Sequence, residues 1–383
     1  MCRMRRHAAR GVAVSGDFGM IVQKLNAWWR RLPSEDAAQR GAAQRAPLYI
    51  RSAGLCCSVG YELAAAHACI AAGMDHFQHS HFKTHTGERV LVAAMPERRL
   101  WGASRLAIWL TKAMEDCLKG RPGLDPSRVA VVWLAPDRPE YPLEGNQWDA
   151  TFTRAVEALN LSFHPESGVL PLGRAGLSDA LAQAQRLLQT PEVDAVLLAG
   201  VDSLIDAATI SRLMGEERLL VQQNSDGFIP GEAAATVLLQ QERPDPAESA
   251  VCILGHASSQ EEGRVDGSTP SRAQGLTRAL RAALAEAELD YRDLDFRCSD
   301  QNGEAFYSRE AANAMSRIAP SGGDALALLT LCDSLGEVGA ALGPAMLAYL
   351  SRSMLHPLSP GACGVLHLAS DDGRRAAVVV ATV

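Results

Sequence analysis

The chain has 383 residues, 47% of them hydrophobic, which is enough to bury an extensive core in two domains or one duplicated unit. Its net charge of −7 gives no support for nucleic-acid binding, and no stretch approaches the ~20 apolar residues of a transmembrane helix. The nine cysteines lack CxxC spacing and most lie in apolar runs, which favours reduced thiols in a cytoplasmic protein over disulfides. We therefore expect a soluble protein that binds neither nucleic acid nor membrane.

Residues 1–47 form a separate segment that is rich in arginine and has few acidic residues before Glu35. Such a start is compatible with a transit peptide, and the Trp28–Arg31 stretch would suit contact with a membrane surface or a partner. The simpler interpretation is a disordered N-terminal extension, or an over-extended reading frame whose true start is Met20. We prefer this simpler interpretation.

Ordered structure is predicted to begin with a strand and glycine turn over 48–60, followed by an alanine-rich helix from about Tyr61 to Ala72. The next segment, 75–85, contains His76, His79, His81 and His85. Imidazoles so close together could bind zinc, but their spacing matches no defined site. We expect a surface loop without a metal.

The rest of the first half alternates helices and apolar strands. The apolar spacing predicts a helix over 100–120, a buried strand over 129–134 and a helix over 176–188. The run 193–203 is short, apolar and flanked by charge, as is typical of a strand buried on both faces. The second half repeats this outline, with strands over 250–256 and 295–300, a helix over 272–287, and final strands around Val365 and over 376–382.

The most specific motif is the turn from Asp226 to Leu239. Gly227 and Phe228 are followed by Gly231 and Glu232, then by small residues and an apolar strand. The glycines frame a tight turn, and a carboxylate among small residues must be paired, so Glu232 is interpreted as structural.

This turn and the strand before it resemble the β-ketoacyl synthases of the thiolase-like superfamily, whose corresponding segments read "dGFvpGEGAavlvLe" and "alaGGvDs". The resemblance covers roughly residues 48–383. It implies an α/β fold of five αβαβα layers with two similar halves, here 48–245 and 246–383. It also implies a homodimer or a heterodimer with a ketosynthase-like chain, with acyl carrier protein as a possible partner. No cofactor or metal is expected.

The resemblance also locates three catalytic positions, and in each this chain departs from the family. Arg174 falls in the position of the nucleophilic cysteine, and no cysteine lies between Cys117 and Cys252. Ser178 is a nearby hydroxyl, but without a basic partner it is interpreted as helping the helix to start.

The two histidine motifs are altered as well. The segment containing Gln301 and Asn302 replaces "HGTGT" and has no histidine. Glu337, after the glycine Gly336, takes the second histidine's place, and Cys332 falls where the family has lysine. The family's "FGFGG" loop is matched only by its glycines, here Gly361 and Gly364.

These substitutions predict a catalytically degenerate protein that acts as an interaction scaffold or adaptor. Its "SDxNGE"-type sequence looks similar to proteins found near bacterial secretion-system components. One alternative is a divergent 3-oxoacyl-ACP synthase, a condensing acyltransferase on acyl thioesters, or the non-catalytic partner subunit of one. In another, Cys332, Glu337, Asp300 and Glu304 form a new site. A thiol beside carboxylates is a poor thiolate, because like charges raise its pKa.

Overall fold

The computed structural model of the chain describes residues 46–96, 99–137, 147–245 and 248–383. The predictions for the N-terminal extension concern residues that, except for 46 and 47, lie outside these ranges.

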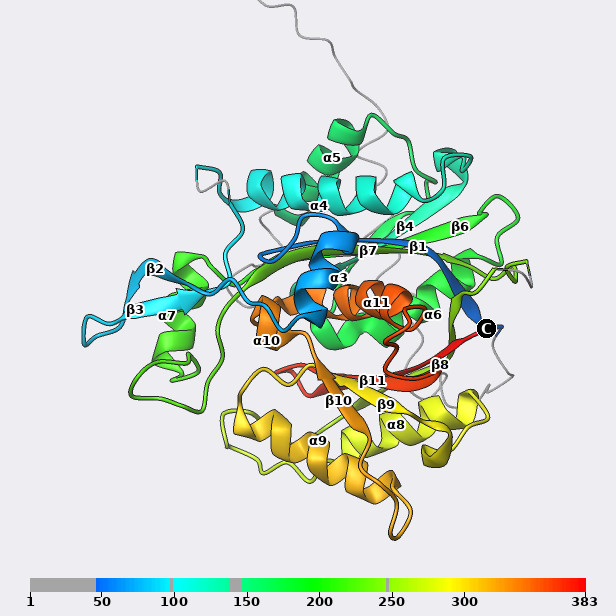
Figure 1. Cartoon of the computed structure of the whole chain (residues 1–383). Coiled ribbons are helices and arrows are strands. Elements are labelled where there is room, and N and C mark those ends of the chain that lie inside the picture. The colour runs from blue at the N-terminus through cyan, green and yellow to red at the C-terminus, as the bar shows by residue number, and fades with distance from the viewer. Residues whose placement is uncertain (1–45, 97–98, 138–146, 246–247) are drawn as a thin grey trace, which may run out of the picture. The chain divides into compact units, whose positions relative to one another are not determined.

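Ten strands form one continuous hydrogen-bonded sheet, to which each half contributes five (Figure 1). The first half has the spatial order β5-β4-β6-β7-β1, and the second has β10-β9-β11-β12-β8. Renumbered from its own first strand, the second order is identical to the first. The first-half strands are β1 (Leu48–Cys57), β4 (Val129–Ala135), β5 (Gly168–Pro171), β6 (Ala195–Ser203) and β7 (Glu232–Gln240). Those of the second half are β8 (Val251–Gln260), β9 (Phe296–Ser299), β10 (Ala327–Thr330), β11 (Cys363–Ala369) and β12 (Arg374–Thr382).

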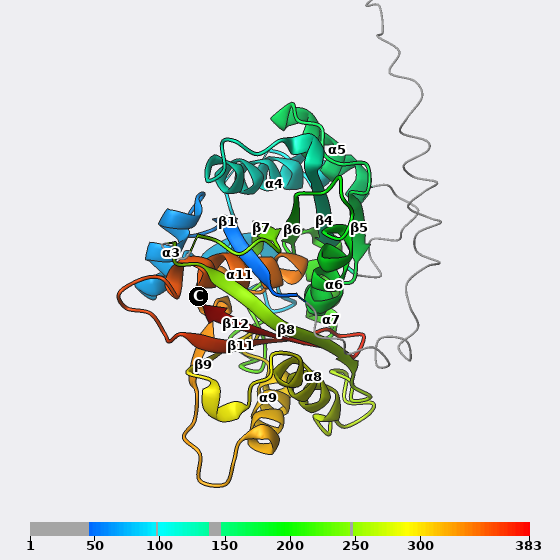
Figure 2. The same ribbon diagram turned by 90° about the vertical axis from the view of Figure 1, so that its right-hand side faces the viewer.

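The two halves meet where the start of β1 pairs antiparallel with β8 over three residues. Helices cover both faces of each five-stranded part, so the halves stack as five layers, which Figures 1 and 2 show from two sides. The outer helices are α4 (Gly102–Lys119) and α5 (Gln147–Leu159) on one side and α8 (Gln274–Glu286) and α9 (Ala305–Ile318) on the other. The central layer contains α3 (Leu63–Ala71), α6 (Leu177–Leu187) and α11 (Leu342–Ser353). The predicted five layers and two similar halves are confirmed.

The sequence of each helix fits its layer. The outer helix α4 buries one stripe, including Leu106, Leu110 and Met114, at helical spacing. The central helix α11 is buried almost all round, as expected for a helix packed between two sheets. None of the helices in the described ranges is long and apolar enough to cross a bilayer.

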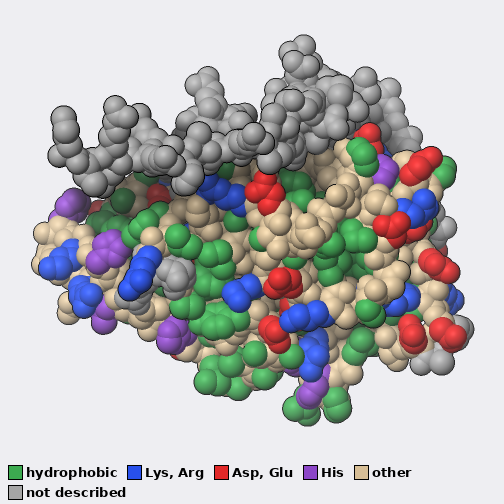
Figure 3. Space-filling view, turned by 90° about the horizontal axis from the view of Figure 1, so that it is seen from above, with side chains coloured by type: hydrophobic (Ala, Val, Ile, Leu, Met, Phe, Trp, Pro, Cys, Tyr) green, Lys and Arg blue, Asp and Glu red, His purple; other side chains and the backbone are tan. Residues whose placement is uncertain are grey.

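The histidine-rich segment is not the loop that we expected. It forms β2 (Gln78–Lys83), paired with β3 (Arg89–Val92) in a hairpin that stands beside α7 (Ala207–Gly215). Alternation explains the difference, because Ser80 faces the interior while His79 and His81 face solvent. Histidine side chains gather at this end of the molecule (Figure 3). The described residues contain no group of His, Cys, Asp and Glu side chains arranged to hold a metal.

The Gly-Glu turn positions the start of β7 against both halves. The buried carboxylate of Glu232 accepts hydrogen bonds from the Met95 amide (2.7 Å), Arg105 Nε (3.0 Å) and Ser203 Oγ (3.0 Å), so its charge is paired. The Gly231 amide donates to the Glu337 carbonyl at 2.8 Å. The turn in the first half therefore lies directly against the segment of the second half that carries Glu337.

We expect Gly231→Ala to lower the thermal unfolding midpoint. A Cβ at this position would lie 2.2 Å from the Leu335 carbonyl oxygen, which is backbone and cannot rotate away. Overpacking of this kind costs about 1–3 kcal/mol. Gly123→Ala is the matched control, because a Cβ there meets nothing within 4 Å. Equal midpoints for the two variants would contradict the close approach.

Candidate functional site

Arg174 lies in the interior, at the junction between the two halves. The chain leaves β5, passes Gly173 at φ +61° and enters the 3-10 turn Arg174–Gly176 that leads into α6. This φ value suits glycine, so Gly173 allows the sharp turn that directs Arg174 inward. Arg174 is only 7% exposed. A guanidinium buried to this degree must be paired.

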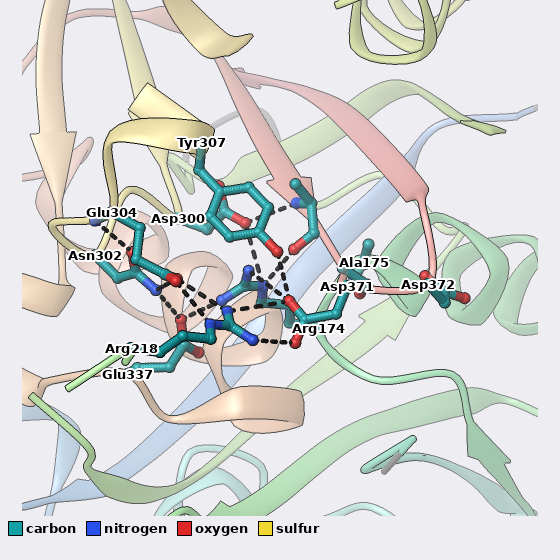
Figure 4. Close-up of polar contacts among 12 residues, drawn as sticks. Arg174, Ala175, Arg218, Asp300, Asn302, Glu304, Tyr307, Glu337, Asp371 and Asp372 are labelled. Atoms are coloured by element: carbon teal, nitrogen blue, oxygen red, sulfur yellow. Dashed lines mark hydrogen bonds and ion pairs between the residues drawn. The ribbon is translucent and has the colours of Figure 1, made fainter. Parts of the chain in front are cut away.

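Arg174 is paired with groups from the second half (Figure 4). Its Nη1 donates to the Glu337 carboxylate in an ion pair, and its Nε donates to the carbonyl of Ala369. Asp300 Oδ2 lies 3.5 Å from Nε, and the guanidinium lies over the Tyr307 ring at 4.8 Å. The residue in the predicted nucleophile position is thus a buried cation held by carboxylates.

Glu337 is satisfied from several sides. Besides Arg174, it accepts hydrogen bonds from Asn302 Nδ2 (3.0 Å) and from the Gly339 amide (2.9 Å). Its backbone amide donates to the Ile229 carbonyl at 2.8 Å. Glu337 does not itself open a helix. It forms a β-bridge to Pro230 and precedes the 3-10 turn Gly339–Ala341 that leads into α11.

A second arginine extends the network. Arg218 makes a bidentate contact with Glu304 (2.7 and 3.0 Å) and donates to Asp371 at 2.6 Å. Asn302 joins this pair to the first, since its Nδ2 also contacts Glu304 at 3.1 Å. The Tyr307 hydroxyl donates to Asp371. We call these eight residues the central ionic cluster: Arg174, Arg218, Asp300, Asn302, Glu304, Tyr307, Glu337 and Asp371.

The central ionic cluster contains two guanidinium groups and four carboxyl groups, and the carboxyl groups differ in pKa. Burial raises the pKa of Asp300 to about 6, although Arg174 and the Ala369 amide partly oppose this shift. Burial acts in the same direction on Asp371, but Arg218 and Arg174 outweigh it, and the pKa of Asp371 is lowered. Burial and Asp371 raise the pKa of Tyr307 well above its ordinary value, so its hydroxyl stays a donor. Of these two aspartates, Asp300 is therefore the one that takes up a proton more readily.

Cys332 lies near the cluster, just after a strand. Strand β10 ends at Thr330, and Cys332 opens the short helix α10 (Cys332–Leu335). Its Sγ is 4.0 Å from the Asp300 carbonyl, and the residue is 6% exposed. Burial, followed by the Glu337 and Asp300 charges, raises the pKa of this thiol well above its ordinary value. Cys332 is thus held as a neutral thiol, which is not nucleophilic.

Gln301 is not a member of the central ionic cluster. It is half-buried, and its backbone amide donates to Ser299 Oγ at 3.2 Å. Of the two positions predicted in this loop, Asn302 is the one whose side chain bridges Glu304 and Glu337.

The expectation that Ser178 lacks a basic partner is wrong. Ser178 Oγ lies 3.0 Å from His256 Nδ1, and His256 Nε2 lies 3.1 Å from Gln185 Oε1. No local pattern signals this pairing, because His256 is 78 residues away on β8. All three side chains are buried, and none lines the cavity beside Arg174. The contact packs α6 against β8.

Two of the motif glycines, Gly227 and Gly336, lie beside the cluster where backbone segments touch, while Gly361 and Gly364 lie at the opposite end of β11. A Cβ added at Gly336 would lie 2.5 Å from the Ile229 carbonyl oxygen, and Gly336 also has φ +69°. A Cβ added at Gly227 would lie 2.6 Å from the Leu219 backbone. At Gly361 and Gly364 it would collide with the side chains of Asp295 and Phe296. Phe228 lies beneath the Arg218 guanidinium at 5.5 Å.

Three cluster members, Arg218, Tyr307 and Asp371, were not predicted. None of the three belongs to a motif that could be recognised in the sequence. Only the fold brings them together. A cavity of about 100 Å³ remains beside Arg174. Pockets for drug-sized ligands usually have about 300–1,000 Å³, so this one admits only a small molecule.

Comparison with known proteins places this geometry in context. No family model matches the sequence. The ketoacyl synthase β subunit of the tetracenomycin polyketide synthase from Streptomyces glaucescens is 28% identical over 213 residues, which are 51% of this chain and 51% of the relative. The chain therefore spans about half the length of the curated relative that it matches.

Solved structures match over a larger share. A type II polyketide ketosynthase in complex with its acyl carrier protein (AntDE:AntF) superimposes with a TM-score of 0.72 at 13% identity, covering 88% of this chain and 99% of that chain. The chain has the thiolase-like fold of the β-ketoacyl synthases. The ishigamide ketosynthase/chain length factor matches with TM-score 0.69 at 15% identity, and a β-ketoacyl synthase from Burkholderia phymatum with 0.69 at 14%, each covering 88% of this chain and 99% of its own. The predicted resemblance to β-ketoacyl synthases is confirmed.

The pKa of Asp300 predicts a specific pH dependence of stability in this ketosynthase-like chain. Because its pKa is raised to about 6 on folding, the folded state binds a proton there between about pH 4 and 6 while the unfolded chain does not. The contribution of this group to stability therefore falls as the pH rises from about 4 to about 6. We expect Asp300→Asn to gain stability relative to wild type across this interval, measured by thermal unfolding at several pH values.

The control is Asp324→Asn, an exposed residue in another loop whose recorded hydrogen bond uses only its backbone carbonyl. Its difference from wild type should stay constant with pH. A constant difference for Asp300→Asn as well would contradict the raised pKa.

Proposed function

We propose that this chain is a catalytically inactive β-ketoacyl synthase-like protein that works by binding protein partners. The observation that carries the proposal is the contact among Arg174, Asn302 and Glu337. These are the residues assigned to the nucleophile and the two histidine positions, and they satisfy one another's hydrogen bonds. A site engaged in this way has no free group with which to attack a thioester.

The chemistry of each group supports this proposal. Acyl transfer through a covalent intermediate needs an activated nucleophile with a base beside it. The pKa of Arg174 is raised well above its ordinary value, because Glu337 and other neighbouring charges outweigh its burial, so it stays a cation. Glu337 accepts three hydrogen bonds, so its carboxylate oxygens are already occupied by donors from this chain. Cys332 is buried as a neutral thiol.

The proposed partner is a ketosynthase-like chain, either a second copy or a catalytic homologue. Among the described strands, the edge strand β5 pairs only with β4, and its sequence Gly-Val-Leu-Pro has no charge to protect the open edge. The curated relative is a ketoacyl synthase β subunit, and one structural neighbour is a ketosynthase/chain length factor. Both support a partner-subunit role over a free-standing enzyme. An acyl carrier protein or a secretion-system component as partner remains a prediction from the sequence.

We expect no covalent acyl adduct when the protein is incubated with acyl-coenzyme A or acyl-carrier-protein thioesters and analysed by intact-mass spectrometry. An active β-ketoacyl synthase treated in parallel shows that the conditions acylate a competent cysteine. An adduct on wild type that disappears in Cys332→Ala would identify Cys332 as a relocated nucleophile. That outcome would favour the alternative, a divergent condensing acyltransferase.

If β5 is the interface, analytical ultracentrifugation should show a dimer. The dimer forms either from two copies of this chain or when this chain is mixed with a ketosynthase-like chain. Val169→Lys, in β5, should weaken it because a lysine on an open edge opposes strand pairing. Leu328→Lys is the matched control, since Leu328 is 44% exposed on β10 at the opposite edge of the sheet. Circular dichroism establishes that both variants stay folded. Dissociation by Leu328→Lys but not by Val169→Lys would exclude β5 as the interface.

A further inference from the structure

The cavity beside Arg174 has a charge pattern that the proposed scaffold role does not require. It lies between the end of β4, the Gly173 turn and the loop after β11, and has a volume of about 100 Å³. Three arginines and five acidic side chains line it, a formal surplus of two negative charges. Three of the acidic side chains, Asp137, Asp371 and Asp372, are exposed at its rim, so the rim attracts a cation.

One buried donor at this cavity also lacks an acceptor. Arg174 Nη2 has no hydrogen-bond partner, although its residue is 93% buried, and it lies 3.9 Å from Asp371 Oδ1, beyond hydrogen-bond distance. The other two guanidinium nitrogens are bonded to Glu337 and Ala369. A buried donor without an acceptor is rare and unfavourable, so the site favours a ligand that brings an oxygen.

The acidic groups at the rim complement this donor. Asp137 lies next to Gly173, which directly precedes Arg174, with 3.7 Å between the Asp137 Cβ and an ideal Cβ at Gly173. Burial and the Asp372 charge raise the pKa of Asp137, while Arg374 opposes them. A carboxylate whose charge is disfavoured in this way gains from an ammonium group placed beside it. Asp372, which contacts Arg374 at 3.6 Å, lines the same cavity and adds negative charge there.

We propose that this cavity binds a small zwitterion with an ammonium group next to a carbonyl or carboxylate, that is, a free α-amino acid or the N-terminus of a peptide. The carboxylate or carbonyl oxygen accepts from Arg174 Nη2, and the ammonium group pairs with Asp137 and Asp372. The volume corresponds to roughly three waters at about 30 Å³ each, so the smallest amino acids fit best. This inference is independent of whether the chain is catalytically active.

Isothermal titration calorimetry on the full chain tests the inference with glycine, L-alanine and L-serine. Methylamine supplies the ammonium group alone and acetate the carboxylate alone. We expect at least one amino acid to bind at least tenfold more tightly than either fragment. Asp137→Asn should weaken that binding at least tenfold, whereas the exposed Asp324→Asn should leave it unchanged.

Glycyl-glycine and alanyl-alanine distinguish the two sources of the ligand. Tighter binding of these peptides with the same Asp137 dependence would assign the site to a peptide N-terminus, and tighter binding of the free amino acids would assign it to a metabolite. Binding of methylamine or acetate as tight as that of every zwitterion would overturn the proposal. So would equal binding to wild type and Asp137→Asn, or no binding of any zwitterion at 10 mM, roughly the weakest range that such titrations resolve.

Discussion

The ion pair between Arg174 and Glu337 is the contact on which the centre of the molecule depends. Arg174 comes from the turn between β5 and α6 in the first half, and Glu337 from the segment before α11 in the second. Both are nearly inaccessible to water, so neither charge tolerates loss of the other. A buried pair of this kind adds little net stability compared with apolar residues, but it fixes geometry strictly. It holds the two halves in one register at the point where a β-ketoacyl synthase would carry out its chemistry.

The neighbouring residues follow from this constraint. Asn302 donates a hydrogen bond to Glu337 and contacts Glu304, which in turn binds Arg218. Asp371, in the loop after β11, is the second carboxylate that binds Arg218. The result is a charged, hydrogen-bonded core with a cavity too small for an acyl chain, in a fold that carries an open edge strand. This combination is the basis of our proposal that the surface of the protein, rather than its interior, performs the function.

The individual strands and helices could be predicted because their signals are local, whereas the five-layered fold came from the resemblance to a known family. Strands β6 and β7 and the turn between them are recognisable from a short apolar run and a glycine pattern, and both periodicity and glycine placement depend only on near neighbours. The positions of Arg174, Asn302 and Glu337 could be assigned by motif, but their mutual contacts could not. Arg218 and Asp371 are 153 residues apart, and no periodicity reports a contact over that distance. The pairing of Ser178 with His256 escaped prediction for the same reason.

The most direct test of this account is a double-mutant cycle on the buried pair, measured by chemical unfolding of wild type, Arg174→Met, Glu337→Met and the double variant. Each single variant leaves one buried charge without its main partner, and we expect a loss of about 3–5 kcal/mol. The double variant removes both charges and should lose clearly less than the sum of the two. Additive losses would contradict the account, because Arg174 and Glu337 would then not depend on each other.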